Sequence, residues 1–406
     1  MHILIIGSGI VGLTSAYQLL EKGFSVTLID KEKEPCLGAS FQNGGQLSYS
    51  HSFAINHIVS IPILCKMIFK PNYQMNLRIS MFLKYFNWFR TLEKNYKAKY
   101  NSDLYDFANK SKKELNRLAN KIGYTKLQNS STVQIYRNKV HYKKVESFVK
   151  NQNLQECHIL SKRELSKIYP DINLDNIVGA ILFKGDQSGD ARDFASKLFN
   201  KCKEYDGFKY LATEKPTAFI KERNKIIAVT LKESKKIFFD KVIFATGASH
   251  EDLFSLCSLK SPLIEARGYS ININNQKLKY PVIDCDRKLV FTNLNNQMRV
   301  AGLYDFLGYS RYRLAKRKKV FIKTIIGTKL LKPFPDPEIW HGFRPVSRDG
   351  YPIIGQSNIY HNLYYNLAHA NLGWTLAAGS GKILLEEILE KDDNKNHFLK
   401  ANRFNI

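Results

Sequence analysis

The first thirty residues contain the pattern that most restricts how this chain folds. Residues 3–6, Ile-Leu-Ile-Ile, predict a short buried strand, and Gly7, Gly9 and Gly12 follow with the spacing G-x-G-x-x-G. In a strand-turn-helix unit the first glycine permits a tight turn, the second lets the backbone approach a pyrophosphate, and the third lets the helix pack on the strand. A helix that begins near Ile10 then offers unpaired N–H groups to the phosphates.

The same unit extends to an acidic residue. Gly23 stands where a left-handed helix cap is expected, and Val26, Leu28 and Ile29 predict a second buried strand that ends at Asp30. A carboxylate at this point can accept hydrogen bonds from a ribose 2′-hydroxyl and repels a 2′-phosphate, so NADP is disfavoured. The alternative is a glycine-rich βαβ unit that binds no ligand.

The composition indicates a globular protein with many basic residues. The chain has 406 residues, which is long enough for two domains, and 44% of them are hydrophobic. The formal net charge is +26. This charge fits a nucleic-acid partner, an anionic membrane surface or a lysine-rich solvated surface. We expect no nucleic-acid partner, because the lysines are dispersed and form no recognisable binding module. The six cysteines are scattered, so no metal site is expected, and Met1 leads straight into the first strand, which predicts a cytoplasmic protein.

Residues 54–90 differ from their surroundings. Apolar residues such as Ile58, Leu64 and Phe69 are interrupted by basic ones such as Lys66. No stretch reaches the roughly 20 uninterrupted apolar residues that span a bilayer. We expect two amphipathic pieces, which either lie in a membrane interface with basic groups on anionic lipid or pack as helices on a second domain.

Later stretches predict strands of two sheets. Residues 242–245, Val-Ile-Phe-Ala, should form a buried strand that returns to the nucleotide-binding sheet. Residues 269–273, 289–292 and 298–302 predict a β-rich, substrate-facing sheet.

Several motifs in sequence order carry a resemblance to a known family. Besides the glycine-rich turn they are Gly38-Ala39-Ser40, Asn43-Gly44-Gly45-Gln46, Ala245-Thr246-Gly247, Gly342-Phe343-Arg344-Pro345 and Leu372-Gly373-Trp374-Thr375. Over essentially its whole length the chain resembles the FAD-dependent D-amino acid oxidase superfamily. Within it, the chain is most similar to the catalytic subunits of bacterial D-amino acid dehydrogenases.

The resemblance implies an α/β fold with two domains. One is a Rossmann-like FAD-binding domain, with a mixed or parallel sheet and a ββα crossover, built from residues 1–50, 145–260 and 341–406. The other is an α+β substrate domain with a large antiparallel sheet, built from residues 51–144 and 261–340.

The resemblance also implies which residues contact FAD. They are Gly7, Gly9, Ile10, Val11, Gly12, Asp30, Lys31, Ser40, Asn43, Gly44, Gly45, Gln46, Pro216, Ala245, Thr246, Gly247, His369, Leu372, Gly373, Trp374 and Thr375. Two positions depart from the family pattern. Pro216 stands where a valine N–H usually binds the adenine, and Ala368-His369-Ala370 replaces Gly-His-Gly, so the local geometry of the site is in question there.

Arg344 and Tyr269 are the catalytic candidates. The position of Arg344 binds the substrate carboxylate in the family, a task that suits a bidentate guanidinium, and the alternative is a salt bridge to Asp349. Tyr269 could donate its hydroxyl to the same carboxylate or be a core residue. His369 is not expected to act as a general base.

The implied reaction is the oxidative deamination of D-amino acids. Hydride leaves Cα for flavin N5, and the imino acid hydrolyses to a 2-oxo acid and ammonia. The family passes its electrons to a quinone, consistent with a basic enzyme bound peripherally to the inner face of the cytoplasmic membrane. Oxidation of glycine, sarcosine or hydroxyproline is one alternative, and an RNA-modifying flavoprotein is another.

Overall fold

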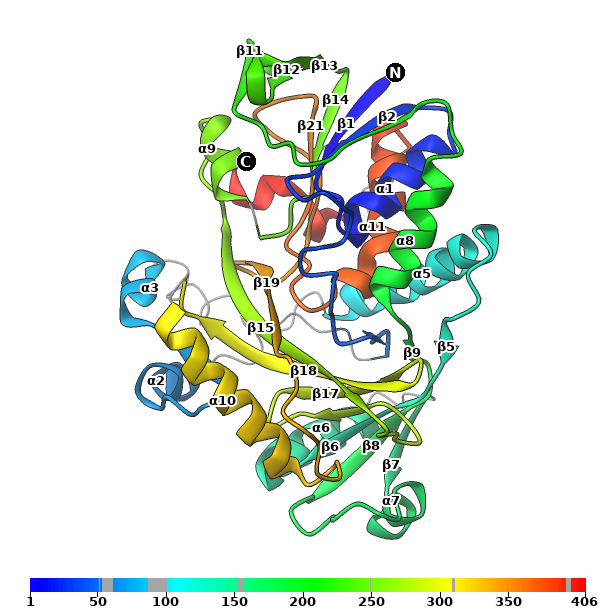
Figure 1. Cartoon of the computed structure of the whole chain (residues 1–406), viewed down its shortest axis with the longest axis vertical. Coiled ribbons are helices and arrows are strands. Elements are labelled where there is room, and N and C mark those ends of the chain that lie inside the picture. The colour runs from blue at the N-terminus through cyan, green and yellow to red at the C-terminus, as the bar shows by residue number, and fades with distance from the viewer. Residues whose placement is uncertain are drawn as a thin grey trace.

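The protein is described by a computed structural model that covers residues 1–50, 52, 61–86, 101–151, 156–248, 250–308, 311–391 and 396–406. Its described part contains a six-stranded and a nine-stranded sheet, each with its own helices (Figure 1). The expected fold class, a Rossmann-like domain beside an α+β domain with a large sheet, is confirmed.

The six-stranded sheet has the order β10-β2-β1-β14-β21-β20. Neighbours are parallel from β10 to β21, and the edge pair β20 and β21 is antiparallel. The strand predicted to return to this sheet does so, because Val242 lies opposite Leu4. The strands are β1 (His2–Ile6), β2 (Ser25–Ile29), β10 (Phe208–Leu211), β14 (Lys241–Phe244), β20 (Ile353–Gln356) and β21 (Leu363–Leu367).

Alternate residues of β1 enter two different cores. Ile3 and Ile5 pack with helices on one face, whereas Leu4 and Ile6 pack with a small antiparallel sheet and a short helix on the other. The first face carries α1 (Ile10–Leu20), α5 (Asn101–Lys121), α8 (Ala191–Cys202), α11 (Gly373–Ile388) and η3 (His397–Leu399). The second carries β11 (Ala218–Glu222), β12 (Lys225–Thr230), β13 (Lys236–Phe238), α9 (Glu251–Leu256) and η4 (Ala401–Phe404), and η2 (Lys232–Ser234) joins β12 to β13.

The nine-stranded sheet forms the second layer of the molecule (Figure 1). Its order is β19-β15-β18-β17-β16-β6-β8-β7, with β4 paired to β18, and its pairs are antiparallel except β16 with β6 and β18 with β4. Its strands are β4 (Met75–Leu77), β6 (Thr132–Tyr136), β7 (Cys157–Leu160), β8 (Gly179–Phe183), β15 (Leu263–Asn274), β16 (Val282–Asp284), β17 (Leu289–Leu294), β18 (Gln297–Phe306) and β19 (Trp340–Ser347).

Short elements complete the second layer and join it to the first. A three-stranded sheet of β3 (Gln46–Leu47), β9 (Gln187–Ser188) and β5 (Gln128–Asn129) lies between the two large sheets. The helices are α2 (Ile61–Phe69), α3 (Ile79–Lys84), α6 (Lys139–Asn151), α7 (Lys162–Ile168) and α10 (Arg311–Thr328). Phe321 and Ile325 of α10 pack against Tyr269 and its neighbours in the large sheet.

The sheets divide the chain differently from the expected boundaries at two places. β7 and β8 lie within residues 145–260, which were assigned to the FAD domain, yet both are hydrogen-bonded into the large sheet. α5 was assigned to the substrate domain, yet Leu104 and Leu115 are buried in the core that α5 shares with α11. Local patterns predict an element but not the sheet or helix that it packs against, which explains both corrections.

Part of the amphipathic segment 54–90 can be followed, while residues 54–60 and 87–90 lie outside the described residues. Met67 of α2 and Phe82 of α3 pack in a core with Met75 and Ile264 of the large sheet. The segment therefore does pack on the second domain through one face. Within the described ranges, none of the helices combines the length and apolar character needed to cross a bilayer.

Gly12 provides a test of how the nucleotide-binding unit is packed. A Cβ at Gly12 would collide with the carbonyl oxygen of Gly7, where the turn meets α1. We expect Gly12→Ala to cost about 1–3 kcal/mol of unfolding free energy because backbone must move, as in other overpacked sites. Thermal and denaturant unfolding measure this. Gly38→Ala is the control, since a Cβ there meets nothing within 4 Å, and equal effects of the two substitutions would contradict the packing argument.

Candidate active site

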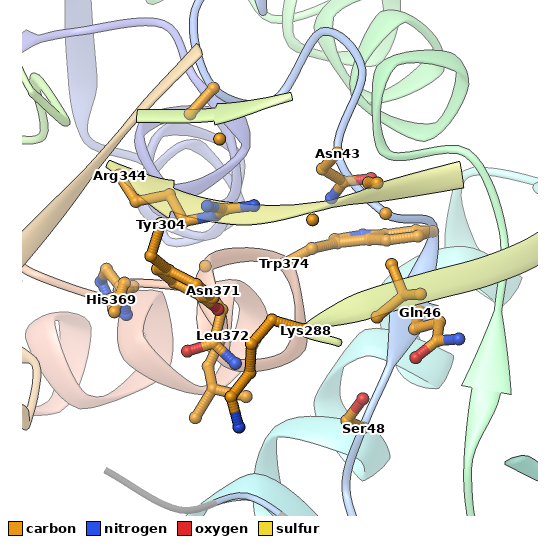
Figure 2. A pocket seen from close by; sticks show the side chains of 18 of the residues that line it. Asn43, Gln46, Ser48, Lys288, Tyr304, Arg344, His369, Asn371, Leu372 and Trp374 are labelled. Atoms are coloured by element: carbon orange, nitrogen blue, oxygen red, sulfur yellow. The ribbon is translucent and has the colours of Figure 1, made fainter. Parts of the chain in front are cut away.

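One cavity, of about 1540 Å³, is lined by residues of both large sheets. One end is lined by the glycine-rich turn and the end of β2, and the other by β17, β18 and β19 of the large sheet. Figure 2 shows side chains from both domains around this space. A cavity lined by such different segments can hold an extended cofactor and a small substrate side by side.

The glycine-rich turn forms one wall of the cavity. Gly7, Gly9, Ile10 and Val11, which are predicted to contact FAD, line it. Gly7 has φ +109°, and a Cβ there would lie 2.5 Å from the Ala245 carbonyl oxygen, so this position requires glycine. Gly12 is not among the lining residues and acts through packing instead.

The end of β2 supplies acidic and polar groups. The Asp30 carboxylate accepts hydrogen bonds from the N–H and hydroxyl of Ser8 at 2.6 and 2.7 Å through Oδ2, and from the Glu32 N–H at 3.0 Å through Oδ1. Oδ1 can accept a further bond from a ribose hydroxyl. Lys31 lines the cavity beside Asp30, and Ser40 accepts a hydrogen bond from the Ile10 N–H at 3.2 Å.

The loop of residues 43–46 is held between the two domains. The Asn43 side chain accepts a hydrogen bond from the Gly45 N–H at 3.0 Å, and Thr292 of β17 donates to the Gly44 carbonyl at 2.7 Å. A Cβ at Gly44 would lie 2.7 Å from Val290, and Gly45 has φ +70°. Asn43, Gly44 and Gln46 line the cavity, whereas Gly45 does not.

The start of α11 points at the same space. Leu372, Gly373 and Trp374 line the cavity, and the helix N-terminus has no side-chain cap, which favours negative charge in front of it. Thr375 lies behind this surface, where its hydroxyl accepts a hydrogen bond from the Ser48 N–H at 3.3 Å.

Six lining residues carry a buried polar atom that has no hydrogen-bond partner among the described residues. These atoms are Gln46 Oε1, Ser50 Oγ, Thr246 Oγ1, His341 Nδ1, His369 Nδ1 and Trp374 Nε1. Burial lowers the pKa of His369 to about 3, so the ring is neutral, and its Nε2–H donates to Asn366 at 2.8 Å, which leaves Nδ1 as an acceptor. Because buried polar groups normally have partners, this cluster fits a bound polar ring system.

Arg344 projects from β19 beside the 43–46 loop (Figure 2). Its Nη1 donates to the Leu303 carbonyl at 2.9 Å, and its guanidinium lies 4.6 Å from the centre of the Tyr304 ring. A Cβ at Gly268 would collide with the guanidinium, so this glycine makes room for it. Asp349, the alternative partner of Arg344, instead binds Arg403 at 2.6 Å.

The comparisons with known proteins decide the family. The family described as FAD dependent oxidoreductase matches residues 2–387. The chain belongs to the FAD-dependent oxidoreductases.

A protein named D-amino acid dehydrogenase, from Vibrio atlanticus, is 27% identical over 100% of both chains. Glycine oxidase from Bacillus cereus has the same fold, with a TM-score of 0.72 and 17% identity, over 98% of this chain and 97% of the other. L-proline dehydrogenase from P. horikoshii also has a TM-score of 0.72, with 18% identity over 99% and 97% of the two chains.

FAD is the cofactor of this oxidoreductase, and the lining residues fit it. The predicted segments at residues 7–11, 30–31, 40–46, 245–247 and 369–374 all border one cavity. Pro216 does not line the cavity, and the nearby Glu214 N–H donates to the Asp30 carbonyl at 2.8 Å. The adenine contact at Pro216 stays a prediction.

The prediction for Tyr269 needs correction. Although Tyr269 borders the cavity, its hydroxyl donates to Asp305 at 2.8 Å, and Asp305 also binds Arg317 at 2.8 Å. Residues opposite each other in an antiparallel sheet share a face, and Arg344 is opposite Ala266. Tyr269 is three residues from Ala266 in β15, so its side chain lies on the other face. Tyr269 thus belongs to the core under α10.

Sequence reasoning missed Tyr304 and Lys288, which both line the cavity (Figure 2). Tyr304 follows Gly302 in the strand predicted at 298–302, and its ring lies against the Arg344 guanidinium. Alternation from Gly302 does not indicate Tyr304, because β18 changes register between the partners of Tyr269 and Arg267, where Leu303 has φ +58°. Lys288 precedes the strand predicted at 289–292, and no motif marked it.

The contact between Gly44 and Val290 can be tested by substitution and rescue. Gly44→Ala should weaken FAD binding about 10-fold to 100-fold, because its Cβ meets Val290 and displaces the loop, an overpacking cost of 1–3 kcal/mol. Gly44→Ala combined with Val290→Ala should recover most of the affinity. FAD dissociation is followed by fluorescence, and failure of the double variant to recover would contradict this contact as the cause.

Proposed function

We propose that this enzyme oxidises D-amino acids to 2-oxo acids and ammonia and passes the electrons to a quinone. The observation that carries the proposal is the Arg344 guanidinium, which faces the cofactor cavity without an acidic partner among the described residues. Full-length relatives named D-amino acid dehydrogenase, 27% and 28% identical to this chain, support the substrate class.

Arg344 would hold the substrate carboxylate. One terminal nitrogen is bound to the Leu303 carbonyl, so the remaining donors of the planar guanidinium can bind both carboxylate oxygens. The Tyr304 ring beneath it and the absent side chain at Gly268 fix its direction. A carboxylate fixed in this way sets the position of Cα relative to the 43–46 loop.

Bound FAD supplies the two-electron acceptor for the Cα hydrogen, which leaves as hydride. The chain provides polar surroundings for it through the uncapped N-terminus of α11 and through Asn43 and Gln46 of the 43–46 loop. Hydride transfer requires no base at Cα. The neutral His369 fits this scheme, because a group whose pKa is lowered to about 3 does not accept protons at neutral pH.

Anaerobic mixing of the flavoprotein with D- and L-amino acids tests the proposal. Bleaching of the flavin absorbance by D-amino acids supports it. Bleaching by glycine, sarcosine or hydroxyproline alone would favour the neighbouring class of amine oxidation. Bleaching by none of these compounds would refute both functions, and salt-dependent binding of tRNA would then favour the RNA-modifying alternative.

Arg344→Met should reduce kcat/KM for D-amino acids about 30-fold to 1000-fold, the usual effect of removing one partner of a buried charged pair. Arg344→Lys should recover only part of the loss because an ammonium lacks the bidentate geometry. Arg348→Met, four residues along the chain, serves as a control for the loss of one positive charge. Unchanged turnover in Arg344→Met would place the carboxylate elsewhere.

The outer faces of α2, α3 and α10 support peripheral binding to an anionic membrane. Residues 61–86 and 311–335 contain no aspartate or glutamate. The Arg317 guanidinium joins α10 to the turn after α2 by donating to the Pro71 carbonyl at 2.7 Å. Exposed apolar side chains on these elements are Phe69, Ile79, Leu83, Phe86 and Ile326, and exposed basic ones are Lys66, Lys70, Arg78, Lys316, Lys319 and Lys323. Inserted rings beside basic groups are typical of interfacial helices.

The enzyme should therefore sediment with phosphatidylglycerol vesicles and not with phosphatidylcholine vesicles, and salt should weaken the binding. Phe69→Ser combined with Leu83→Ser should weaken it at least about tenfold, because these side chains would be inserted. Ile359→Ser, at an exposed apolar residue outside this surface, is the control. Equal binding to both lipids would contradict the membrane proposal and leave the deamination proposal standing.

A further inference from the structure

Lys288 is an ammonium group that faces the cavity without a counter-ion. It lies in the turn between β16 and β17 and is half-buried. Among the described residues its side chain has no hydrogen bond and no ion pair, although it lines the cavity. Figure 2 shows the side chain extending into the space in front of Leu372, away from Arg344.

The backbone around Lys288 is fixed in an unusual conformation. Lys288 has φ +56° and Leu303 has φ +58°, a region that residues with a Cβ adopt rarely. The Leu303 N–H donates to the Lys288 carbonyl at 3.1 Å, and a Cβ at Gly302 would collide with that carbonyl. Such conformations cost energy and persist where the surrounding structure holds them. Leu303 of β18 therefore binds the Lys288 carbonyl through its N–H and holds Arg344 through its own carbonyl.

The acids nearest to Lys288 are already engaged. Asp284 accepts from the Arg137 guanidinium at 2.7 Å and from the Arg287 N–H at 3.0 Å. Asp286 accepts from the Arg137 N–H at 2.6 Å, the Asn138 N–H at 2.9 Å and His141 at 2.8 Å. Loss of hydration lowers the pKa of Lys288 even though Cys285, Asp286 and Asp284 act in the opposite direction. A partly dehydrated cation of this kind gains free energy when a mobile anion binds to it.

We propose that Lys288 binds a second carboxylate, carried by the substrate side chain, so that the preferred substrates are acidic D-amino acids such as D-glutamate and D-aspartate. The inference rests on the proposed D-amino acid oxidation. Arg344 holds the α-carboxylate, and Lys288 meets the other end of the same molecule, since Arg344 on β19 and Lys288 in the turn between β16 and β17 face different parts of one cavity (Figure 2). Basic D-amino acids are disfavoured, because Lys288 would repel their side chains and the neighbouring Asp284 and Asp286 are already bound to other groups.

The kinetic test compares substrates within each variant. In the wild type, kcat/KM should be higher for D-glutamate than for D-alanine, and lowest for D-lysine and D-arginine. The ratio of D-glutamate to D-alanine should fall at least about tenfold in Lys288→Met, the loss expected for one charged contact. Lys288→Arg should retain part of the ratio. Lys144→Met removes an exposed lysine at the rim of the same cavity and should leave the ratio within about twofold, because solvent screens this charge.

Equilibrium binding provides a second measurement that is independent of turnover. Glutarate carries two carboxylates and butyrate carries one, and both perturb the flavin absorbance if they bind beside it. Lys288→Met should weaken the binding of glutarate about tenfold more than the binding of butyrate.

The outcomes separate this inference from the proposed function. Flavin reduction by D-alanine with no preference for D-glutamate, or an unchanged ratio in Lys288→Met, would overturn the role of Lys288 and leave D-amino acid oxidation intact. An equal loss for both substrates would also overturn it, because Lys288 would then serve the α-carboxylate. Absence of reduction by every D-amino acid would refute the proposed function, and the glutarate measurement would still decide whether Lys288 binds the second carboxylate.

Discussion

The site depends on one contact between the domains, in which the large sheet holds the loop of residues 43–46. Arg299 of β18 is the centre of this contact. Its guanidinium donates to the Asn43 carbonyl at 3.4 Å, to Asn272 at 3.0 Å and to Asp190, the N-cap of α8, at 3.0 Å. One buried cation thus joins the loop, the substrate sheet and a helix of the nucleotide domain. Each of the three partners accepts a hydrogen bond from a different nitrogen of the guanidinium.

The nucleotide-binding unit could be predicted from sequence because its signals are local. The turn at Gly7 needs glycine for reasons within a few residues, and β1 alternates between two cores along its own length. The substrate side could not be predicted in the same way. A bulge between Arg267 and Tyr269 changes which side chains face the cavity, and no short pattern marks it. Arg344 was found through its motif, whereas Tyr304 required the register of three strands.

The two candidate binding cations differ in how the fold prepares them. The direction of the Arg344 side chain is set before a ligand binds, because the Leu303 carbonyl and the Tyr304 ring contact its guanidinium and Gly268 leaves space for it. Lys288 is placed by its backbone alone, and its four-carbon side chain remains adjustable. A fixed guanidinium combined with an adjustable ammonium in another part of the cavity would allow substrates with side chains of different length to bind. The Cα of each substrate would keep the same position.

We call the part of the cavity beside the glycine-rich turn and the end of β2 the cofactor groove, and the part beside β17, β18 and β19 the substrate chamber. The two form one continuous space. A ring system that lies in the groove therefore becomes a wall of the chamber, and its faces contribute to what the chamber can bind. Occupancy of the two parts is then thermodynamically linked: whatever strengthens retention of the cofactor also raises affinity for a substrate that touches it, and the reverse holds equally. Such coupling would make substrate analogues stabilising ligands of the holoenzyme and weak ligands of the apoprotein.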